Sequence, residues 1–286
     1  MSDKMKNFVV RALTGIVYVV LLVGCTVYSP LTAFLFFSLV SFASVFEFCT
    51  IMNKHNGCQL SRSITAMAGV CLGAAIWVMC VGGEGSAKMM ALYGFLLVFI
   101  IVKELFRTDG QPMMNWAMAF ASQIYVALPF ALLPLLCVSI DGERPVYMWI
   151  YPLAMFIFLW TSDTGAYLCG STLSRFFPAK LFPRISPNKS WVGSIGGGLL
   201  TVGASAIIWS LTPDTMALWK WIGFALVVVV FGTLGDLVES SLKRQLGIKD
   251  SGNILPGHGG MLDRFDSCVL AIPAVVIYFL LINDIA

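Results

Sequence analysis

The chain has 286 residues, of which 58% are hydrophobic and only 12% are charged, and its mean hydropathy is +0.86. This composition lies far outside the range of soluble globular domains, so it excludes a soluble protein and indicates an integral membrane protein. The formal net charge of +3 says little by itself, whereas the positions of the charges say more.

Nine apolar stretches are long enough to cross a bilayer as helices, because a hydrocarbon core of roughly 30 Å needs about 20 residues. They lie near residues 8–28, 31–52, 63–83, 87–106, 113–140, 147–168, 191–212, 217–238 and 265–283. A membrane β-barrel would alternate polar and apolar residues, and runs such as FALVVVVFG do not. The sequence therefore predicts an all-α polytopic membrane protein with about nine transmembrane helices.

The basic residues predict how these helices are oriented, because Lys and Arg in short loops favour the cytoplasmic side. If the N-terminus is cytoplasmic, all but three of the 18 Lys and Arg residues fall in cytoplasmic segments, the exceptions being Lys88, Arg144 and Lys220. We therefore expect a cytoplasmic N-terminus, an external C-terminus and a first helix that is retained instead of cleaved as a signal peptide.

Two long polar connections lie on the predicted cytoplasmic side, at residues 163–191 and 239–265. Connections of this length in a compact protein are usually functional. We therefore divide the chain into an N-terminal region of about five transmembrane helices, residues 1–145, and a C-terminal transmembrane region, residues 146–286. The second region carries both loops and is expected to carry any active site.

The acids around the second loop form two pairs with the same spacing. Asp236 and Glu239 close the eighth predicted helix, while Asp263 and Asp266 open the ninth. Residues three apart lie on one face of a helix, and two such carboxylate pairs facing each other would hold a hard cation. The alternative is that they are ordinary interfacial carboxylates, paired with neighbouring arginines.

Basic residues and glycines fill the sequence between the acid pairs. The basic residues are Lys243, Arg244, Lys249 and Arg264. Glycine lets backbone amides approach a ligand, and cations suit phosphate oxygens. Acid pairs for Mg²⁺ beside such a loop are the parts that phosphoryl transfer requires, although the cations could instead anchor the loop to anionic headgroups. His258, between glycines, is a candidate to bind a phosphate or to move a proton.

The first loop repeats this combination on a smaller scale. Asp163 lies at the inner end of the sixth predicted helix, and Lys189 precedes Ser190, which is a predicted N-cap of the next helix. A lysine beside a helix N-terminus makes an anion site together with the exposed amides. Gly193 and Gly197 indicate close packing between helices.

Two further polar residues lie within otherwise apolar predicted helices. Glu47 belongs to the second helix and Gln123 to the fifth. Each is expected to form a hydrogen bond between helices, and contact of Glu47 with a substrate is the weaker alternative.

The segment SSLKRQLGIKDSGNILPGHGGMLDRFD, residues 240–266, resembles the signature of the phosphatidate cytidylyltransferases, or CDP-diacylglycerol synthases. That pattern runs S-x-x-K-R-x4-K-D and then P-x-H-G-G-x-x-D-R-x-D, and every fixed position is present. SDTGAYLCG and ISPNKSWVGSIGG also look like stretches of this family, except that Val192 stands where the family usually has Glu. This departure puts in doubt any role that the family gives to that carboxylate.

The resemblance implies an enzyme in which a phosphatidate oxygen attacks the α-phosphorus of CTP, releasing pyrophosphate and giving CDP-diacylglycerol for phospholipid biosynthesis. The residues expected to be catalytic are Asp263, Asp266, His258, Lys243 and Arg264. Those expected to bind substrate are Arg244, Lys249, Asp250, Gly259, Gly260, Lys189, Ser186 and Asp163. Those expected to bind metal are Asp236, Asp263, Asp266 and Glu239.

The expected cofactor is Mg²⁺, and the expected partners are CTP and phosphatidate in the bilayer, with a homodimer as an open option and no nucleic acid. The expected location is a bacterial inner (plasma) membrane, with the active site facing the cytoplasm. Two alternatives stay open. A CTP-dependent lipid kinase acting on a polyprenol-type alcohol would release CDP instead of pyrophosphate, and a non-enzymatic cation transporter would move ions without CTP.

Overall fold

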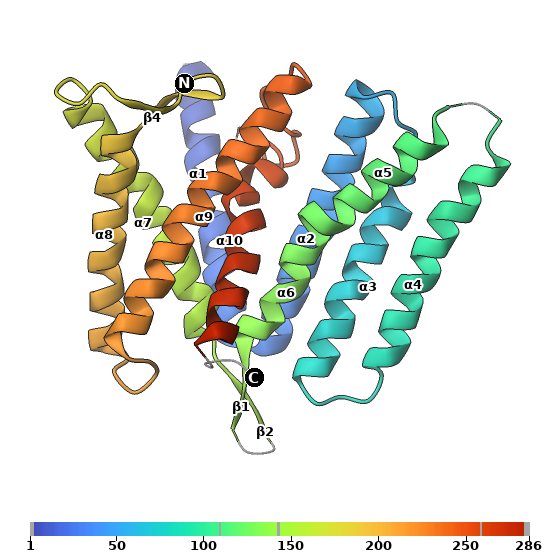
Figure 1. Ribbon diagram of the computed structural model, residues 1–286, viewed down its shortest axis with the longest axis horizontal. Helices are drawn as coiled ribbons and strands as arrows, with labels where there is room; N and C mark the ends of the chain where they lie inside the picture. Colours follow the sequence, from blue (N-terminus) through green and yellow to red (C-terminus); the bar gives the residue numbers. More distant parts are fainter. Residues whose placement is uncertain (1–2, 109, 142–143, 258, 283–286) are drawn as a thin grey trace. The chain divides into compact units, whose positions relative to one another are not determined.

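A computed structural model describes residues 3–108, 110–141, 144–257 and 259–282, and it is mostly helical, as the composition predicts (Figure 1). The chain forms two compact units. The first contains residues 1–149 and 246–265, and the second contains residues 150–245 and 266–286. Each unit therefore combines two separate stretches of sequence.

The first unit holds the N-terminal helices. These are α1 (Asp3–Tyr28), α2 (Pro30–His55), α3 (Arg62–Cys80), α4 (Ser86–Lys103), the short 3-10 helix η1 (Glu104–Phe106), α5 (Pro112–Ser122), the π-helical turn η2 (Gln123–Ala127) and α6 (Leu128–Cys137). The Ser29 hydroxyl accepts a hydrogen bond from the Thr32 N–H at 3.2 Å, and Pro30 occupies the first turn of α2, where no N–H is needed. The predicted boundary between α1 and α2 is confirmed, and local capping marks it.

The fifth predicted helix, residues 113–140, is correct as far as Cys137 and wrong beyond it. Residues Val138–Asp141 form strand β1, which pairs antiparallel with β2 (Arg144–Tyr147). Pro134 weakens the end of α6 because it has no N–H to donate, and the branched side chains that follow favour a strand. A hairpin therefore stands where hydropathy alone predicts more helix.

The second unit holds the remaining elements. These are α7 (Ile150–Leu173), β3 (Lys180–Phe182), β4 (Ser186–Ser190), α8 (Trp191–Leu211), α9 (Leu218–Gln245) and α10 (Leu262–Leu281), whose first residues belong to the first unit. β3 and β4 pair as a second antiparallel hairpin. The core of this unit is aromatic. The ring centroid of Phe224 lies 5.2 Å from that of Phe158 and 5.0 Å from that of Phe279, and both pairs have edge-to-face geometry.

Helices α7 and α8 pack closely through glycine, as the sequence predicts. A Cβ atom on Gly197 would lie 2.5 Å from the carbonyl oxygen of Ser162, and one on Gly193 would lie 2.8 Å from that of Ala166. Only glycine permits this approach of the two backbones. The predicted N-cap is also confirmed, because the Ser190 hydroxyl accepts a hydrogen bond from the Gly193 N–H at 3.2 Å.

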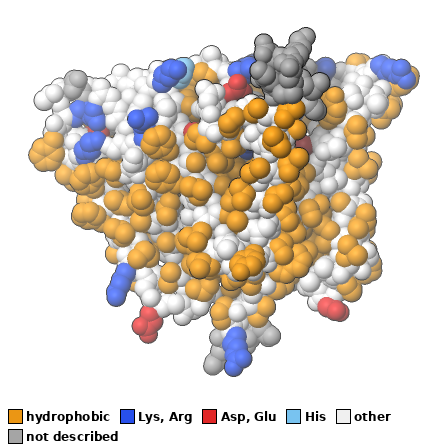
Figure 2. All heavy atoms as spheres, turned by 180° about the vertical axis from the view of Figure 1, so that it is seen from behind, with side chains coloured by type: hydrophobic (Ala, Val, Ile, Leu, Met, Phe, Trp, Pro, Cys, Tyr) orange, Lys and Arg blue, Asp and Glu red, His pale blue; other side chains and the backbone are white. Residues whose placement is uncertain are grey.

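Eight helical segments of the described chain are long and apolar enough, by length and composition, to cross a membrane. They correspond to eight of the nine predicted spans. Helix α7 is the exception, because the polar run TSDTG at residues 161–165 interrupts its apolar sequence. In Figure 2 hydrophobic side chains cover most of the visible surface, and Lys, Arg, Asp and Glu side chains gather toward its margins. The sixth predicted span, which corresponds to α7, and the orientation of the termini stay predictions.

Two helices extend further into the polar connections than predicted. Helix α7 continues past the predicted end at 168 to Leu173, so Asp163 lies within the helix, as the predicted span has it, and the first connection begins later. Helix α9 continues to Gln245, so Lys243 and Arg244 lie in its last turn instead of in the loop. The second connection therefore shortens to the residues between Gln245 and Leu262.

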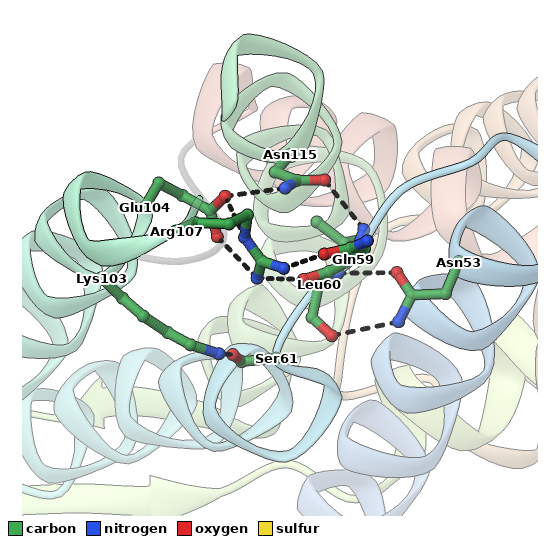
Figure 3. A network of polar contacts seen from close by, with 8 residues as sticks. All are labelled: Asn53, Gln59, Leu60, Ser61, Lys103, Glu104, Arg107 and Asn115. Atoms are coloured by element: carbon green, nitrogen blue, oxygen red, sulfur yellow. Dashed lines mark hydrogen bonds and ion pairs between the residues drawn. The ribbon is translucent and has the colours of Figure 1, made fainter. Parts of the chain in front are cut away.

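A buried polar network ties the loops of the first unit together (Figure 3). Glu104 is only 7% exposed, and its carboxylate accepts hydrogen bonds from Arg107 Nε at 2.8 Å and from Asn115 Nδ2 at 2.7 Å. Asn115 Oδ1 in turn accepts from the Gln59 N–H at 2.9 Å. Arg107 also donates to the side chain and, at 2.9 Å, to the carbonyl of Gln59. This network connects the α2–α3 loop to the segment between α4 and α5.

Candidate functional site

The second unit brings acids and lysines from three elements together. Lys189 at the end of β4 forms an ion pair with Asp236 of α9, and the Ser240 hydroxyl donates to the other oxygen of Asp236 at 3.1 Å. Asp163 of α7 lies close enough to Lys189 and Asp236 to interact with both electrostatically. Residues that are far apart in the sequence thus form one charged cluster.

Glu239 and Asp266 extend this cluster. The Glu239 side chain is 1% exposed, and its Oε1 atom lies 3.3 Å from Lys243 Nζ, one turn further along α9. Asp266 of α10 interacts electrostatically with Asp236 and Lys243, and the Glu239 side chain reaches it as well. One oxygen of Asp266 accepts from the N–H of Ser267 at 2.6 Å. We call these six residues the acid–lysine cluster: Asp163, Lys189, Asp236, Glu239, Lys243 and Asp266.

The acid–lysine cluster carries more negative than positive side chains in a helical, largely apolar unit. Four carboxylates face two ammonium groups, and neighbouring carboxylates repel each other unless a cation or a proton intervenes. Among the described residues, no three acidic, His or Cys side chains form a ready set of metal ligands. Mg²⁺, however, is usually held by one or two carboxylates together with water and substrate phosphates. Asp236 and Asp266, with oxygen donors only, fit that mode.

The loop between α9 and α10, which belongs to the first unit, is compact. The Leu255 N–H donates to the Gly259 carbonyl at 3.0 Å and closes a narrow turn. Gly259 has a φ of +86°, and a Cβ atom there would lie 2.8 Å from Asp263 Oδ2. The loop also contacts α1, where the Thr14 hydroxyl donates to the Pro256 carbonyl at 3.3 Å. The described part of this loop is thus held by a backbone hydrogen bond of its own and by α1.

Asp263 organises this loop from the first turn of α10. Its Oδ2 atom accepts hydrogen bonds from the N–H of Ser251 at 2.7 Å and of Gly260 at 2.8 Å. The Ser251 hydroxyl in turn accepts from the Asp263 N–H at 3.3 Å. Backbone amides therefore occupy one oxygen of a carboxylate for which the sequence predicts metal binding and catalysis.

Glu47 of α2 holds the same loop from a second side. Its side chain is buried, and its Oε2 atom accepts from the Leu262 N–H at 2.9 Å and from the Ser251 hydroxyl at 3.4 Å. A Cβ atom on Gly260 would lie 2.6 Å from this oxygen, and one on Gly252 would lie 2.4 Å from Glu47 Oε1. Two glycines of the loop are thus needed where the backbone meets this carboxylate.

The sequence did not predict this role of Glu47. The expected hydrogen bond to another helix exists, because Leu262 begins α10, but its partners also include the loop itself. The available signal for this role in the sequence was the presence of a carboxylate within an otherwise apolar helix. The sequence alone could not identify donors more than 200 residues away. For Gln123 the expectation is confirmed, since its Nε2 atom donates to the Thr65 carbonyl of α3 at 2.9 Å.

The other predicted site residues divide between the units. Ser186 begins β4 and is partly buried, in the second unit; Arg244, also there, is exposed on the last turn of α9. Three more predicted site residues belong to the first unit and are exposed: Lys249, Asp250 and Arg264. Gly259 and Gly260 lie beside Asp263, as described above. His258 lies outside the described residues.

Comparison with known proteins gives a consistent result. The family model described as "Cytidylyltransferase family" matches residues 9–282. A curated relative from Staphylococcus aureus (strain COL), named phosphatidate cytidylyltransferase, is 46% identical over 123 residues, which cover 43% of this chain and 46% of the relative. Relatives with the same name from Staphylococcus saprophyticus and Staphylococcus epidermidis are 44% and 45% identical over the same length. The match spans less than half the length of each of these relatives.

Proposed function

The chain belongs to the cytidylyltransferase family, and we propose that it transfers the cytidylyl group of CTP to phosphatidate in the membrane. The products would be CDP-diacylglycerol and pyrophosphate, which serve phospholipid biosynthesis. The observation that carries this proposal is the acid–lysine cluster on α7, β4, α9 and α10. Its charges suit a reaction between phosphates, and two of its helices, α9 and α10, are joined by the loop of residues 246–261, which we call the motif loop.

The lysines of the cluster would bind the phosphates of the two substrates. Both reacting molecules are anionic, so their approach is opposed by charge repulsion that Lys189 and Lys243 would reduce. Both lysines are held in place by carboxylates on α9, Asp236 and Glu239, respectively. The substrates would therefore meet cations whose positions are already fixed, and positioning of this kind lowers the barrier to reaction.

The carboxylates would hold the metal ion. Asp236 and Asp266 would supply the protein oxygens, and Glu239 would support them through its contacts with Asp266 and Lys243. Mg²⁺ bound there would neutralise negative charge on the phosphates of CTP. Asp163 would complete the cluster at α7 by attracting Lys189 and helping to hold its ammonium group in place.

The reaction would need no covalent intermediate with the protein. A phosphate oxygen of phosphatidate would form a bond to the α-phosphorus of CTP while the bond between the α-phosphorus and the bridging oxygen breaks. Pyrophosphate would leave with that electron pair. Phosphatidate is already ionised near neutral pH, so a general base is not required for the attack, and most of the rate would come from electrostatics and alignment.

We place this site at the cytoplasmic face of a bacterial inner membrane. CTP is a cytosolic nucleotide, the apolar helices embed the chain in a bilayer, and the curated relatives are bacterial. The acyl chains of the substrate would then remain in the membrane while its phosphate reaches the acid–lysine cluster.

The test is an assay with the purified chain in detergent, phosphatidate, Mg²⁺ and CTP labelled in the cytidine. Wild-type protein should form labelled CDP-lipid and pyrophosphate, and Asp266→Asn should lower kcat at least about 100-fold, because it removes charge stabilisation at the reacting phosphates. Asp214→Asn is the matched control, since Asp214 is exposed in the turn between α8 and α9. It should retain wild-type activity.

Other products would contradict the proposal. Formation of CDP together with a phosphorylated lipid alcohol would identify a CTP-dependent kinase. Cation flux through liposomes in the absence of CTP, without any CDP-lipid product, would identify a transporter. Folded wild-type protein that makes no CDP-lipid would refute the transferase assignment.

A further inference from the structure

An apolar groove runs along α8 and α9 in the second unit, next to the acid–lysine cluster. Its volume is about 560 Å³. Its lining includes Phe182, Trp191, Ile195, Gly198, Val230 and Leu237. The groove begins near the cluster, because Trp191 follows Lys189 by two residues and Leu237 follows Asp236 directly. One end of the groove is therefore charged and the rest is apolar.

The length of this groove matches one leaflet of a bilayer. Its lining extends from Trp191 to Val202 on α8 and from Leu226 to Leu237 on α9. At a rise of 1.5 Å per residue, each stretch is about 16 Å long. The hydrocarbon core of a membrane is roughly 30 Å thick, so the groove covers about half of it. This is the depth that one acyl chain occupies when its headgroup lies at the membrane surface.

The β3–β4 hairpin joins the groove to positive charge. Leu181 and Phe182 of β3 line the groove, while Lys180 and Arg184 of the same hairpin are exposed. Lys189 on β4 is already paired with Asp236 in the cluster. An amphipathic anion with a hydrocarbon tail fits both properties, since cations attract its phosphate and the groove covers its tail.

From these observations we propose that the α8–α9 groove binds one acyl chain of the phosphatidate whose phosphate lies at Lys189. This inference rests on the proposed function and adds to it the part of the protein that holds the lipid tail. Trp191, with 53% of its surface exposed at the charged end, marks the level of the headgroups, where tryptophan is favoured.

A second groove provides a matched comparison. It lies between α7 and α8 and has a volume of about 580 Å³. Its described lining comes from these two helices and not from the β3–β4 hairpin. Gly198 of α8 lines the first groove, and Gly203 of the same helix lines the second. Leucine at either position would fill one groove and leave the other unchanged.

Both substitutions are compatible with the fold. A Cβ atom on Gly198 would lie 3.5 Å from Val229 Cγ1, an ordinary contact, and one on Gly203 would meet nothing within 4 Å. Leucine also favours a helix more than glycine does. If Gly198→Leu nevertheless failed to fold, Val230→Trp would fill the same groove from α9, where Val230 is 51% exposed.

The experiment measures KM for dioleoyl and for dihexanoyl phosphatidate at saturating CTP, with the full chain in mixed micelles. Gly198→Leu should raise KM for the dioleoyl lipid at least about tenfold, because losing burial of only about two methylenes has that effect. Its KM for the short-chain lipid should stay within about twofold. Gly203→Leu should leave both values within about twofold. Equal effects of the two variants, or no dependence on chain length, would overturn the proposal.

Crosslinking locates the chain without relying on activity. A phosphatidate analogue with a diazirine in the middle of one acyl chain should label peptides of α8 and α9, and unlabelled phosphatidate should compete more strongly than unlabelled phosphatidylcholine. Labelling that phosphatidylcholine displaces equally would identify bulk lipid and overturn the proposal, as would labelling confined to other helices. Specific labelling of a chain that makes no CDP-lipid would support the groove and refute the enzymatic proposal.

Discussion

The buried carboxylate of Glu47 provides the sharpest test of how the motif loop is held. Glu47→Ala removes the acceptor of two donors, the Leu262 N–H and the Ser251 hydroxyl, which belong to residues that are 1% and 7% exposed. A buried donor without an acceptor costs about 1–3 kcal/mol. The loop should therefore lose roughly 2–6 kcal/mol of local stability if no water replaces the carboxylate.

This loss should appear as local opening of the loop. An energy of 2 kcal/mol corresponds to a factor of roughly 30 in an equilibrium constant, so amide hydrogen exchange in residues 250–263 should accelerate at least that much. Activity with CTP and phosphatidate should fall as well, because the loop would no longer present its amides in fixed positions. Glu47→Gln keeps one acceptor oxygen. In this variant, amide hydrogen exchange in residues 250–263 should therefore accelerate by less than about tenfold.

Gln123→Ala is the matched control for Glu47→Ala. Gln123 is also buried between helices of the first unit, and its described hydrogen bonds go to Thr65 and Ser122 instead of to the loop. The Gln123→Ala variant should lower the melting temperature of the protein without accelerating amide hydrogen exchange in residues 250–263. If Glu47→Ala behaved like this control, with unchanged loop exchange and activity, the reasoning that Glu47 positions the loop would be refuted.

Four further predictions concern other parts of the molecule. Glu104→Gln should lower the free energy of unfolding by about 1–3 kcal/mol in thermal melts, because it weakens the buried pair with Arg107, while activity per folded molecule stays unchanged. Gly197→Val should destabilise the second unit by at least about 1–3 kcal/mol, because its Cβ would lie 2.5 Å from the Ser162 carbonyl oxygen; wild-type stability would contradict the packing. Lys189→Met should raise KM for phosphatidate about tenfold and leave KM for CTP within about twofold, and an equal rise in both would argue against its placement at the lipid phosphate. EDTA should abolish CDP-lipid formation and added Mg²⁺ should restore it, whereas activity that survives chelation would exclude the metal site at Asp236.

The helices of this protein are largely predictable from the sequence, and the reason is physical. A segment inside a bilayer must satisfy its own backbone hydrogen bonds, so a long apolar run is nearly obliged to be helical. Hydropathy therefore predicts a helix only as far as the apolar run extends. Helix α9 continues through SSLKRQ to Gln245 because Leu, Lys, Arg and Gln favour helices in water as well, which hydropathy does not register.

The candidate site was predictable in its composition and only partly in its geometry. Spacing along one helix predicted that Asp236 and Glu239 share a face, because it depends on a single element. The pairing of Lys189 with Asp236 joins residues from separate elements of the second unit, and the bonds of Glu47 to the loop join residues more than 200 positions apart. Periodicity within one segment carries no information on such contacts.

The hydrogen-bond environments separate the acids of the motif into two kinds, although the sequence presents them as equivalent pairs. Asp263, like Glu47, is surrounded by donors of the loop backbone and its serine, so much of its charge is already satisfied by the protein. Asp236 and Asp266 instead face other charged side chains in the second unit. A carboxylate with unbalanced negative neighbours gains most from an added cation, because relief of like-charge repulsion adds to the direct attraction. Metal binding is therefore expected to depend on Asp236 and Asp266 through their charge, whereas Asp263 is expected to act on the substrate through the shape of the loop that it holds.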